Sequence, residues 1–259
     1  MLDKLSKRHF EIRCESHAAA ILEGDFPVAL EELETALQSL TVPIGEIIGS
    51  GGGETKGTQR MRHAFNEVGW HKFIFEIRKI INGVEREAIS HEVDHVKDFG
   101  GHKLALEIEW NNKDPFFDRD LENFKRLHAE GAISAGVIVT RGSSLHDKMG
   151  DFVFRFAREQ NIRSFDDLER LDVQLTRRKR TDIQKRVERA KNPIDFATAW
   201  TDNFVSDKYG EATTHWKKLM DRISRGVGNP CPLLLIGLPA SIVSFETQPA
   251  TKPKVKKEG

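Results

Sequence analysis

The chain has 259 residues, 38% of them hydrophobic, and its 40 basic residues balance 40 acidic ones. This length and composition predict one sizeable domain, and the zero net charge excludes a general electrostatic attraction to nucleic acid, so that any such attraction must be local. Two distant cysteines, Cys14 and Cys231, exclude a disulfide framework or a cysteine zinc site, and no apolar run is long enough to span a membrane.

The two ends of the chain give further expectations. The first 15 residues alternate charged and apolar side chains, which is not typical of a signal peptide. Residues 247–259 are rich in proline and lysine and are expected to form a disordered basic tail. We therefore expect a single domain over residues 1–246, in a reduced, cytoplasmic setting.

The first forty residues contain two helical patterns, the second being PVALEELETALQSL with leucines at three- and four-residue spacing. A glycine-rich segment follows at 48–58, but it lacks the GK[ST] of a nucleotide-binding loop, so it is either a loop that approaches a ligand or a plain surface loop. Residues 59–69 are typical of a helix, and residues 73–81 of a strand with alternating sides.

Residues 91–99 and 102–110 are two strand-like runs separated by Gly100 and Gly101. Two glycines between short strands predict a tight hairpin, because its turn needs positive φ angles. If these glycines are the loop, opposed residues have numbers that sum to about 201. Asp94 then faces Glu107, and Asp98 faces Lys103.

The second half of the chain completes an α/β pattern. Residues 118–130 are predicted to form a helix with Asp118 as its N-cap, and the apolar run AISAGVIVT after Gly131 is predicted to be a buried strand. Residues 150–190 are mainly helical in pattern, and PLLLIGL at 232–238 predicts another buried strand. The resulting β-β-α-β unit indicates an α/β domain.

Four carboxylates of the hairpin are predicted to share one face: Glu92, Asp94, Glu107 and Glu109. Opposed acidic side chains repel each other, and a divalent cation would cancel that repulsion. Oxygen ligands suit Mg²⁺, so the pattern favours metal-assisted phosphodiester hydrolysis. A solvated hairpin face remains the alternative, and Asp98 remains a rival to Asp94 although the register pairs it with Lys103.

Roles in the predicted site follow from this arrangement. Asp94 and Glu107 would bind the metal, together with the main-chain carbonyl of Ile108. Glu109 would orient or deprotonate the attacking water. In-line displacement at phosphorus would leave a 5′-phosphate and a 3′-hydroxyl.

The segment HEVDHV…LALEIEWNNKDPFFDRDL resembles the BglII/BstYI-type restriction endonucleases of the PD-(D/E)xK nuclease superfamily. The glycine-rich region before it, ISAGVIVTRG after it and KYGEATTHWKKLMDRISRGVGNPCPLLLIGL near the C-terminus resemble the same enzymes, over most of residues 45–240.

The resemblance implies a restriction-endonuclease-like core, in which helices flank a mixed central sheet with a catalytic hairpin. It also implies a homodimer that uses Mg²⁺ to cut both strands of double-stranded DNA at a short palindromic site. The acidic positions of the family map to Asp94, Glu107 and Glu109. Most of the superfamily has lysine at the last position, whereas BamHI-like enzymes have glutamate and BglII-like enzymes glutamine.

Three further groups are candidate DNA contacts, each with a structural alternative. Asn111, Asn112 and Lys113 would contact the scissile phosphate or merely form hydrogen bonds at the strand end. Thr213, Thr214 and His215 would reach base edges or cap a helix. The basic segment 177–191 would follow phosphates, or be in part a solvated helix face.

Two other functions fit the same residues. A DNA-repair or structure-specific nuclease would use the same hairpin, since folds host several functions. A non-catalytic DNA-binding protein is disfavoured, because an acid-crowded face is a poor surface for DNA unless a cation bridges it.

Overall fold

The computed structural model describes residues 1–49 and 56–245. The centre of the glycine-rich segment and the predicted C-terminal tail lie outside these residues. Within the described ranges, no helix combines the length and the apolar character that crossing a bilayer requires.

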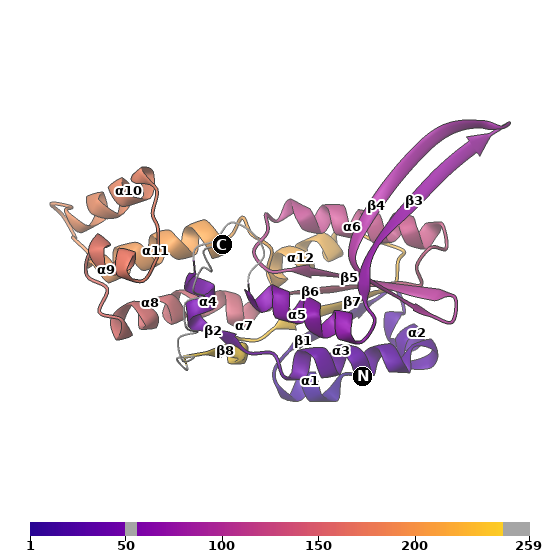
Figure 1. The fold of residues 1–259 in the computed structure, drawn as a ribbon, viewed down its shortest axis with the longest axis horizontal. Helices are drawn as coiled ribbons and strands as arrows, with labels where there is room; N and C mark the ends of the chain where they lie inside the picture. The colour runs from indigo at the N-terminus through magenta and orange to yellow at the C-terminus, as the bar shows by residue number, and fades with distance from the viewer. Residues whose placement is uncertain (50–55, 246–259) are drawn as a thin grey trace, which may run out of the picture.

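A six-stranded mixed sheet forms the centre of the molecule, in the order β1-β7-β6-β5-β4-β3 (Figure 1). Its strands are β1 (Glu11–Glu15), β3 (His71–Ile81), β4 (Val84–Phe99), β5 (His102–Glu109), β6 (Ala135–Arg141) and β7 (Leu233–Leu238). Strands β5, β6 and β7 run parallel, and the other neighbours are antiparallel. A separate parallel pair joins β2 (Val42–Pro43) to β8 (Val243–Ser244). The predicted α/β class with a mixed sheet is confirmed.

Helices cover both faces of this sheet. One apolar core packs leucines of β5 against the N-terminal helices, α5, α8 and α11, and a second core packs the other face against α6 and α12. The helices are α1 (Asp3–Lys7), α2 (Ala18–Asp25), α3 (Pro27–Gln38), α4 (Ile44–Ile48), α5 (Lys56–Glu67), α6 (Pro115–Ala129), α7 (Ser143–Asp147), α8 (Met149–Glu159), α9 (Phe165–Arg170), α10 (Arg177–Val187), α11 (Phe196–Tyr209), α12 (Trp216–Ser224) and the short η1 (Ala240–Ile242).

Helix α6 begins earlier than the sequence predicted. Its N-cap is Asp114, not Asp118, because Pro115 occupies the first turn, where a missing amide proton costs nothing. The helix packs tightly on the sheet, since a Cβ atom at Gly136 of β6 would lie 2.4 Å from the Phe124 ring. Glycine at this position therefore lets α6 approach the centre of the sheet.

Strand β1 is the other departure in the N-terminal region, where only helices were expected. Four of its five residues are half-buried, Arg13 is exposed, and the strand pairs antiparallel with β7, more than 200 residues away in sequence. A strand this short has no clear periodicity of its own, so its partner decides its conformation.

The Gly-Gly hairpin has the predicted register. Five pairs, from Phe99–His102 to His95–Leu106, have numbers that sum to 201, and both glycines have positive φ. Strand β4 then continues far beyond the hairpin with β3, and the two form a long ribbon that projects from the body of the molecule (Figure 1). Asn82 and Gly83, both at positive φ, make its tip.

Candidate active site

The site lies where β4 and β5 separate. The last residues that they pair are His95 and Leu106, so Asp94 and Glu107 come directly after the end of this ladder. Beyond it, β5 pairs only with β6, and β4 only with β3.

A β-bulge lies at the predicted first acidic residue. The pairing of β4 with β3 shifts register between Val93 and Val96, and both valines belong to the core beneath α6. Residues three apart on one side of a strand break the usual alternation, so the bulge contains Asp94 and His95. The side chain of Asp94 is exposed, yet its charge acts on Glu107 and on Asp120 of α6.

Glu107 and Glu109 are buried on the face of β5 that α6 covers. Their exposed fractions are 4% and 2%, and Ala105, two residues before Glu107, packs in the core beneath α6. The side chain of Ile108 points to the opposite core. Two carboxylates thus face a helix from within the sheet.

Asp120 completes this group, although it was not among the site residues predicted from the sequence. It lies on α6 and is only 1% exposed. The signal was present in the sequence, because Asp120 falls three residues after Phe117 and four before Phe124, within the apolar stripe of the helix. A carboxylate at such a position is rarely buried without a partner.

Burial and mutual repulsion raise the proton affinity of this cluster. Burial first, and then the charge of Asp120, raise the pKa of Glu109 to about 9, and the same two causes in the same order raise the pKa of Glu107 well above its ordinary value. Burial likewise raises the pKa of Asp120. Without a cation, Glu109 therefore holds its proton at neutral pH.

Two polar side chains hold the cluster in place. The Nδ2 atom of Asn112 donates to Oε2 of Glu109 over 2.8 Å. Arg119 contacts Oδ1 of Asp120 through Nε and Nη2, at 2.8 and 2.7 Å, and its Nη2 lies 3.7 Å from Glu109. Arg119 is about half exposed, so one guanidinium at the rim faces three buried carboxylates.

The donor set fits a hard divalent cation. Carboxylate oxygens are the ligands that Mg²⁺ prefers, and a single arginine leaves excess negative charge in the cluster. Asp94, Glu107, Glu109 and Asp120 are the residues that could hold such an ion, but among the described residues only His146, Glu211 and His215 bring three ligand atoms within 4.8 Å of one another.

Glu92 and Asp98 do not join the cluster. Val93 faces the α6 core, so Glu92 projects to the other side of the ribbon, where it forms an ion pair with Lys72. This differs from the predicted common face, because the bulge changes the alternation. Asp98 forms an ion pair with Lys103 over 3.0 Å and accepts from the amide of Gly101, as the register predicted.

Structural hydrogen bonds occupy the residues that follow the site. The side chain of Asn112 donates to Glu109, and its main-chain carbonyl accepts a hydrogen bond from the amide of Thr214. The backbone of Lys113 forms an isolated antiparallel β-bridge with Thr213. The side chains of Asn112 and Lys113 are both exposed. Asn111 is half-buried.

The three candidates for base reading are buried instead. Thr213, Thr214 and His215 are 9%, 0% and 1% exposed. The buried guanidinium of Arg141 donates to Oγ1 of Thr213 over 2.6 Å and to the carbonyl of Thr214 over 2.8 Å. His215 is the N-cap of α12 but makes no capping hydrogen bond with its side chain. In the protein without DNA these residues pack before α12, so the structural alternative accounts for them, and their contact with DNA bases stays a prediction.

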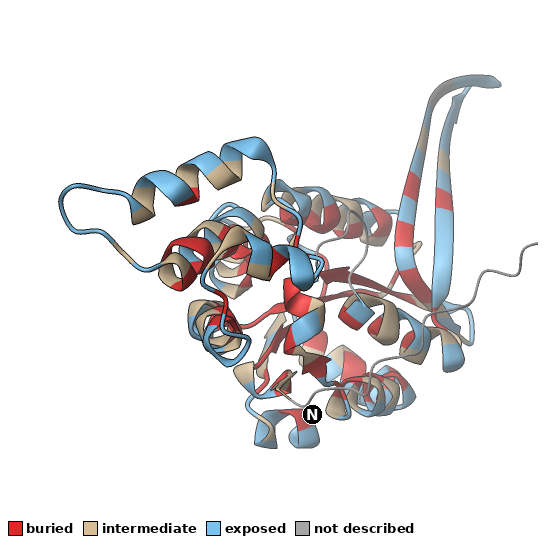
Figure 2. Cartoon of the chain, turned by 60° about the vertical axis from the view of Figure 1, so that its left-hand side comes forward, coloured by how far each residue is buried: buried red, intermediate tan, exposed pale blue. Residues whose placement is uncertain are grey.

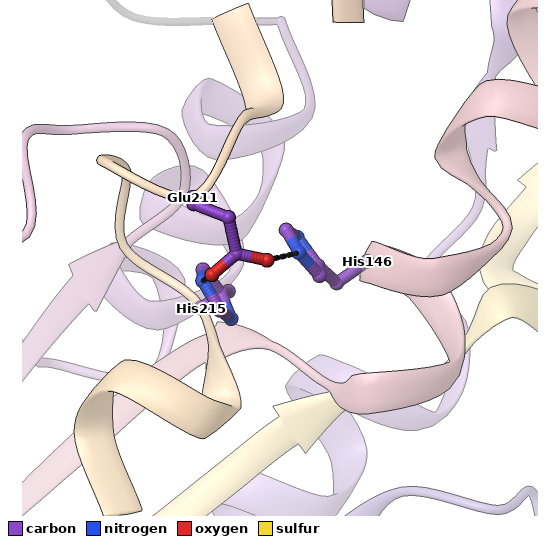
Figure 3. A group of neighbouring side chains, drawn as sticks. All are labelled: His146, Glu211 and His215. Atoms are coloured by element: carbon purple, nitrogen blue, oxygen red, sulfur yellow. Dashed lines mark ion pairs between the residues drawn. The ribbon is translucent and has the colours of Figure 1, made fainter. Parts of the chain in front are cut away.

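A second group of possible metal ligands, His146, Glu211 and His215, lies beside Arg141 (Figure 3). The imidazole rings of the two histidines stack at 3.8 Å with an interplanar angle of 6°. Parallel rings cannot both direct an in-plane lone pair at one ion. Arg141 also contacts Nδ1 of His146 at 3.3 Å, which places the ring proton on Nε2, facing Glu211. This group therefore stabilises the loop before α12 and is a poor metal site.

The basic segment 177–191 is partly neutralised. Lys179, Arg180 and Arg186 of α10 form ion pairs with Asp207, Glu169 and Asp202. The remaining basic residues of the segment are not in any ion pair recorded within the described ranges, namely Arg177, Arg178, Lys185, Arg189 and Lys191. Five of the eight basic residues of the segment thus lie outside these ion pairs, and their contact with phosphates stays a prediction.

Comparison with known protein families decides the class of the protein. Residues 10–238 match the family described as restriction endonuclease BglII/BglIII. The chain belongs to this family. No curated protein matches it significantly. As a BglII/BglIII family member, it is a type II site-specific deoxyribonuclease with the restriction-endonuclease-like fold, and DNA is its substrate. Endonucleases of this type generally need a divalent metal ion, which agrees with the buried carboxylates beneath α6.

Proposed function

We propose that this BglII/BglIII family endonuclease makes Mg²⁺-dependent double-strand cuts at a short palindromic site, and leaves 5′-phosphate and 3′-hydroxyl ends. The observation that carries the proposal is the burial of Glu107, Glu109 and Asp120 at the point where β4 and β5 separate, with Asp94 at the edge. Asp94 and Glu107 are the proposed metal ligands, with the carbonyl of Ile108.

Bound Mg²⁺ would polarise the scissile phosphate and acidify a water molecule. Glu109 orients that water or takes its proton, and Asn112 holds the Glu109 carboxyl in place for this task. Arg119, half exposed at the rim, is available to a phosphate oxygen, while Lys113 adds an exposed positive charge just beyond the site.

Two copies of the chain would act together, because a palindrome presents the same bases to each and two sites cut both strands. The β3–β4 ribbon supports this part of the proposal. Within the described ranges seven large hydrophobic side chains are exposed, and five of them lie on the ribbon: Phe73, Ile74, Ile80, Ile81 and Val84. Figure 2 shows that most of its outer length is exposed.

The charges of the ribbon favour a second copy over DNA. Acidic and basic residues are equal in number along residues 72–92, so the ribbon has no net attraction for phosphates. Exposed apolar side chains between balanced charges suit another protein surface. We therefore assign the ribbon to the contact between the two copies.

Digestion of supercoiled plasmid DNA with Mg²⁺ tests the proposed function. We expect discrete linear fragments, whose sequenced ends give one palindromic site, and we expect Glu107→Gln to abolish cutting while DNA binding persists. Glu122→Gln, a change at a half-exposed side chain of α6, is the matched control and should cut normally. Nicks or smears would indicate a repair or structure-specific nuclease, and binding without any cleavage would indicate a non-catalytic protein.

A further inference from the structure

Arg141 holds a buried positive charge without a direct counter-ion among the described residues. Its guanidinium is fully buried, and its hydrogen-bond partners are neutral: three main-chain carbonyls, Oγ1 of Thr213 and Nδ1 of His146. A buried charge is normally paired, because apolar surroundings disfavour it. The surroundings of Arg141 therefore have an excess of positive charge that an anion would balance.

The stacked rings of His146 and His215 direct their Nε2 atoms at the carboxyl group of Glu211 (Figure 3). Oε1 of Glu211 lies 3.5 Å from Nε2 of His146, and Oε2 lies 3.9 Å from Nε2 of His215. Each oxygen thus faces one ring. Parallel rings are unsuited to a single metal ion, but they suit an anion with two oxygen atoms, since each ring can donate to its own oxygen.

Glu211 is held only loosely in this position. Both distances exceed the usual N–H···O range of about 2.7–3.2 Å, and its side chain is 69% exposed. His215, in contrast, is 1% exposed, and its buried Nε2 has no hydrogen-bond partner. A buried polar atom without a partner is costly, so the position suits a better acceptor than Glu211.

Two further features add positive charge around Glu211. Helix α12 begins directly after His215, and its N-cap makes no hydrogen bond with its side chain, so the positive end of the helix dipole is not offset there. Lys217, in the first turn of α12, is exposed, and its charge acts on Glu211. Both features favour an anion at the position of the Glu211 carboxyl.

This group lies beside the active-site segment. The amide of Thr214 donates to the carbonyl of Asn112 over 2.8 Å, and the side chain of Asn112 donates to Glu109. DNA that reaches Glu109 therefore passes close to His215. A DNA duplex carries one phosphate charge for about every 1.7 Å of its axis, so it brings phosphates to this group as well.

The geometry points to His146 and His215 as a binding site for a DNA phosphate away from the scissile bond, where this phosphate displaces Glu211. The two non-bridging oxygens of the phosphate take the places of Oε1 and Oε2, while Arg141 and Lys217 supply positive charge. This inference rests on the proposed function and adds to it a contact outside the catalytic carboxylates.

Fluorescence anisotropy of a labelled duplex of mixed sequence, in EDTA and at low salt, tests this inference, because phosphate contacts do not depend on sequence. We expect Glu211→Gln to tighten binding by about threefold or more, since the competing charge is lost. Asp221→Asn removes the same charge from an exposed position further along α12, and this matched control should change binding by less than about twofold. Equal tightening in both variants would show a general effect of charge and refute the inference.

Variants of His146 separate a hydrogen-bond donor from a structural residue. His146→Phe keeps an aromatic ring in the stack but removes the N–H group, so it should weaken binding and abolish the effect of Glu211→Gln in the double variant. His146→Gln keeps an N–H donor and should bind nearly as the unmodified chain does. If Glu211→Gln tightens binding equally in the His146→Phe background, the inference is wrong. The comparison of Glu211→Gln with Asp221→Asn remains decisive if His146→Phe does not fold, because both of those positions are exposed.

Inorganic phosphate distinguishes a DNA phosphate from a free one. We expect the duplex to shift the NMR signals of both histidine rings, and inorganic phosphate at the same phosphate concentration to leave them unchanged. Equal shifts would indicate a site for free phosphate and overturn the assignment to DNA.

The outcomes also separate this inference from the proposed function, because the binding assay requires no cut. Cutting of plasmid DNA by a chain that binds no duplex in EDTA, or whose variants all bind alike, would refute only this inference. The expected changes in binding without any cutting would refute only the proposed function. If the unmodified chain neither binds the duplex nor cuts DNA, both fail.

Discussion

Glu109 shows how one position in the sheet changes the chemistry of a residue. An exposed glutamate at the end of a strand would be ionised at neutral pH. Here the sheet, α6 and Asp120 raise its pKa to about 9, while Asn112 donates a hydrogen bond to it. The same surroundings that hold a proton on Glu109 would hold a cation in the proton's place, so metal binding should release protons.

The raised pKa of Glu109 predicts that the metal-free protein loses stability as pH rises. Between the unfolded value near 4.5 and the folded value of about 9, the folded chain retains a proton that the unfolded chain has lost, so unfolding becomes easier with each pH unit. We expect denaturation in urea with EDTA to give a higher free energy of unfolding at pH 5 than at pH 8.

The variant Glu109→Gln provides the control, because it cannot titrate. Its stability should depend less on pH over this range, by at most about 1.4 kcal/mol per pH unit for one proton. An equally steep dependence in Glu109→Gln would assign the effect to other members of the coupled cluster.

At the scale of elements, Arg141 connects the end of the sheet to the C-terminal segment. Its guanidinium is fully buried and donates to the carbonyl of Trp110 after β5, over 2.7 Å, and to Thr213 and Thr214 before α12. Burial lowers its pKa to about 10, yet it remains charged at neutral pH. Hydrogen bonds from Arg141, a residue of β6, thus fix the segments on both sides of the loop that contains Asn112.

We expect Arg141→Lys to destabilise the fold by about 3 kcal/mol, because an ammonium group cannot reach the separate acceptors and some stay buried and unpaired. Urea denaturation would measure this loss. Arg155→Lys, which changes an exposed arginine that pairs with Glu159 on α8, should change stability by less than about 0.5 kcal/mol. An equal loss in both variants would contradict the role of Arg141 as a connector.

At the scale of the whole molecule, the β3–β4 ribbon and the rest of the chain differ in how far their large apolar side chains are buried. The body buries its large apolar side chains in two cores on either side of the sheet, whereas the ribbon projects with apolar side chains exposed. A two-stranded ribbon is marginally stable by itself, so contact with another surface would stabilise it. This contrast makes the ribbon the part of the molecule that the proposed second copy would stabilise most.

The triple variant Ile80→Thr, Ile81→Thr and Val84→Thr tests that dependence. Threonine keeps the strand propensity of these residues but removes much of their apolar surface. We expect light scattering after size-exclusion chromatography to show fewer dimers and more monomers at micromolar concentration. Val28→Thr, at an exposed position on α3, should leave the oligomeric state unchanged. A dimer of unchanged stability in the triple variant would place the contact elsewhere.

Local sequence determined the hairpin and its chemistry in large part. Gly100 and Gly101 specify a two-residue turn, and that turn alone sets the register that pairs Asp98 with Lys103 and aligns the acidic ends of the two strands. The apolar stripe of α6 and the buried strands β6 and β7 were also predictable, because their periodicity is a property of neighbouring residues.

Only the tertiary structure decided which residues meet. The bulge at Asp94, the burial of Asp120 against Glu107 and Glu109, and the pairing of β1 with β7 all depend on contacts between segments distant in sequence. The burial of Thr213, Thr214 and His215 around Arg141 has the same origin. The periodicity of a sequence shows which side of a helix or strand is apolar. The packing of one element on another decides which polar side chains face each other, and those neighbours determine the charge and the function of each polar side chain.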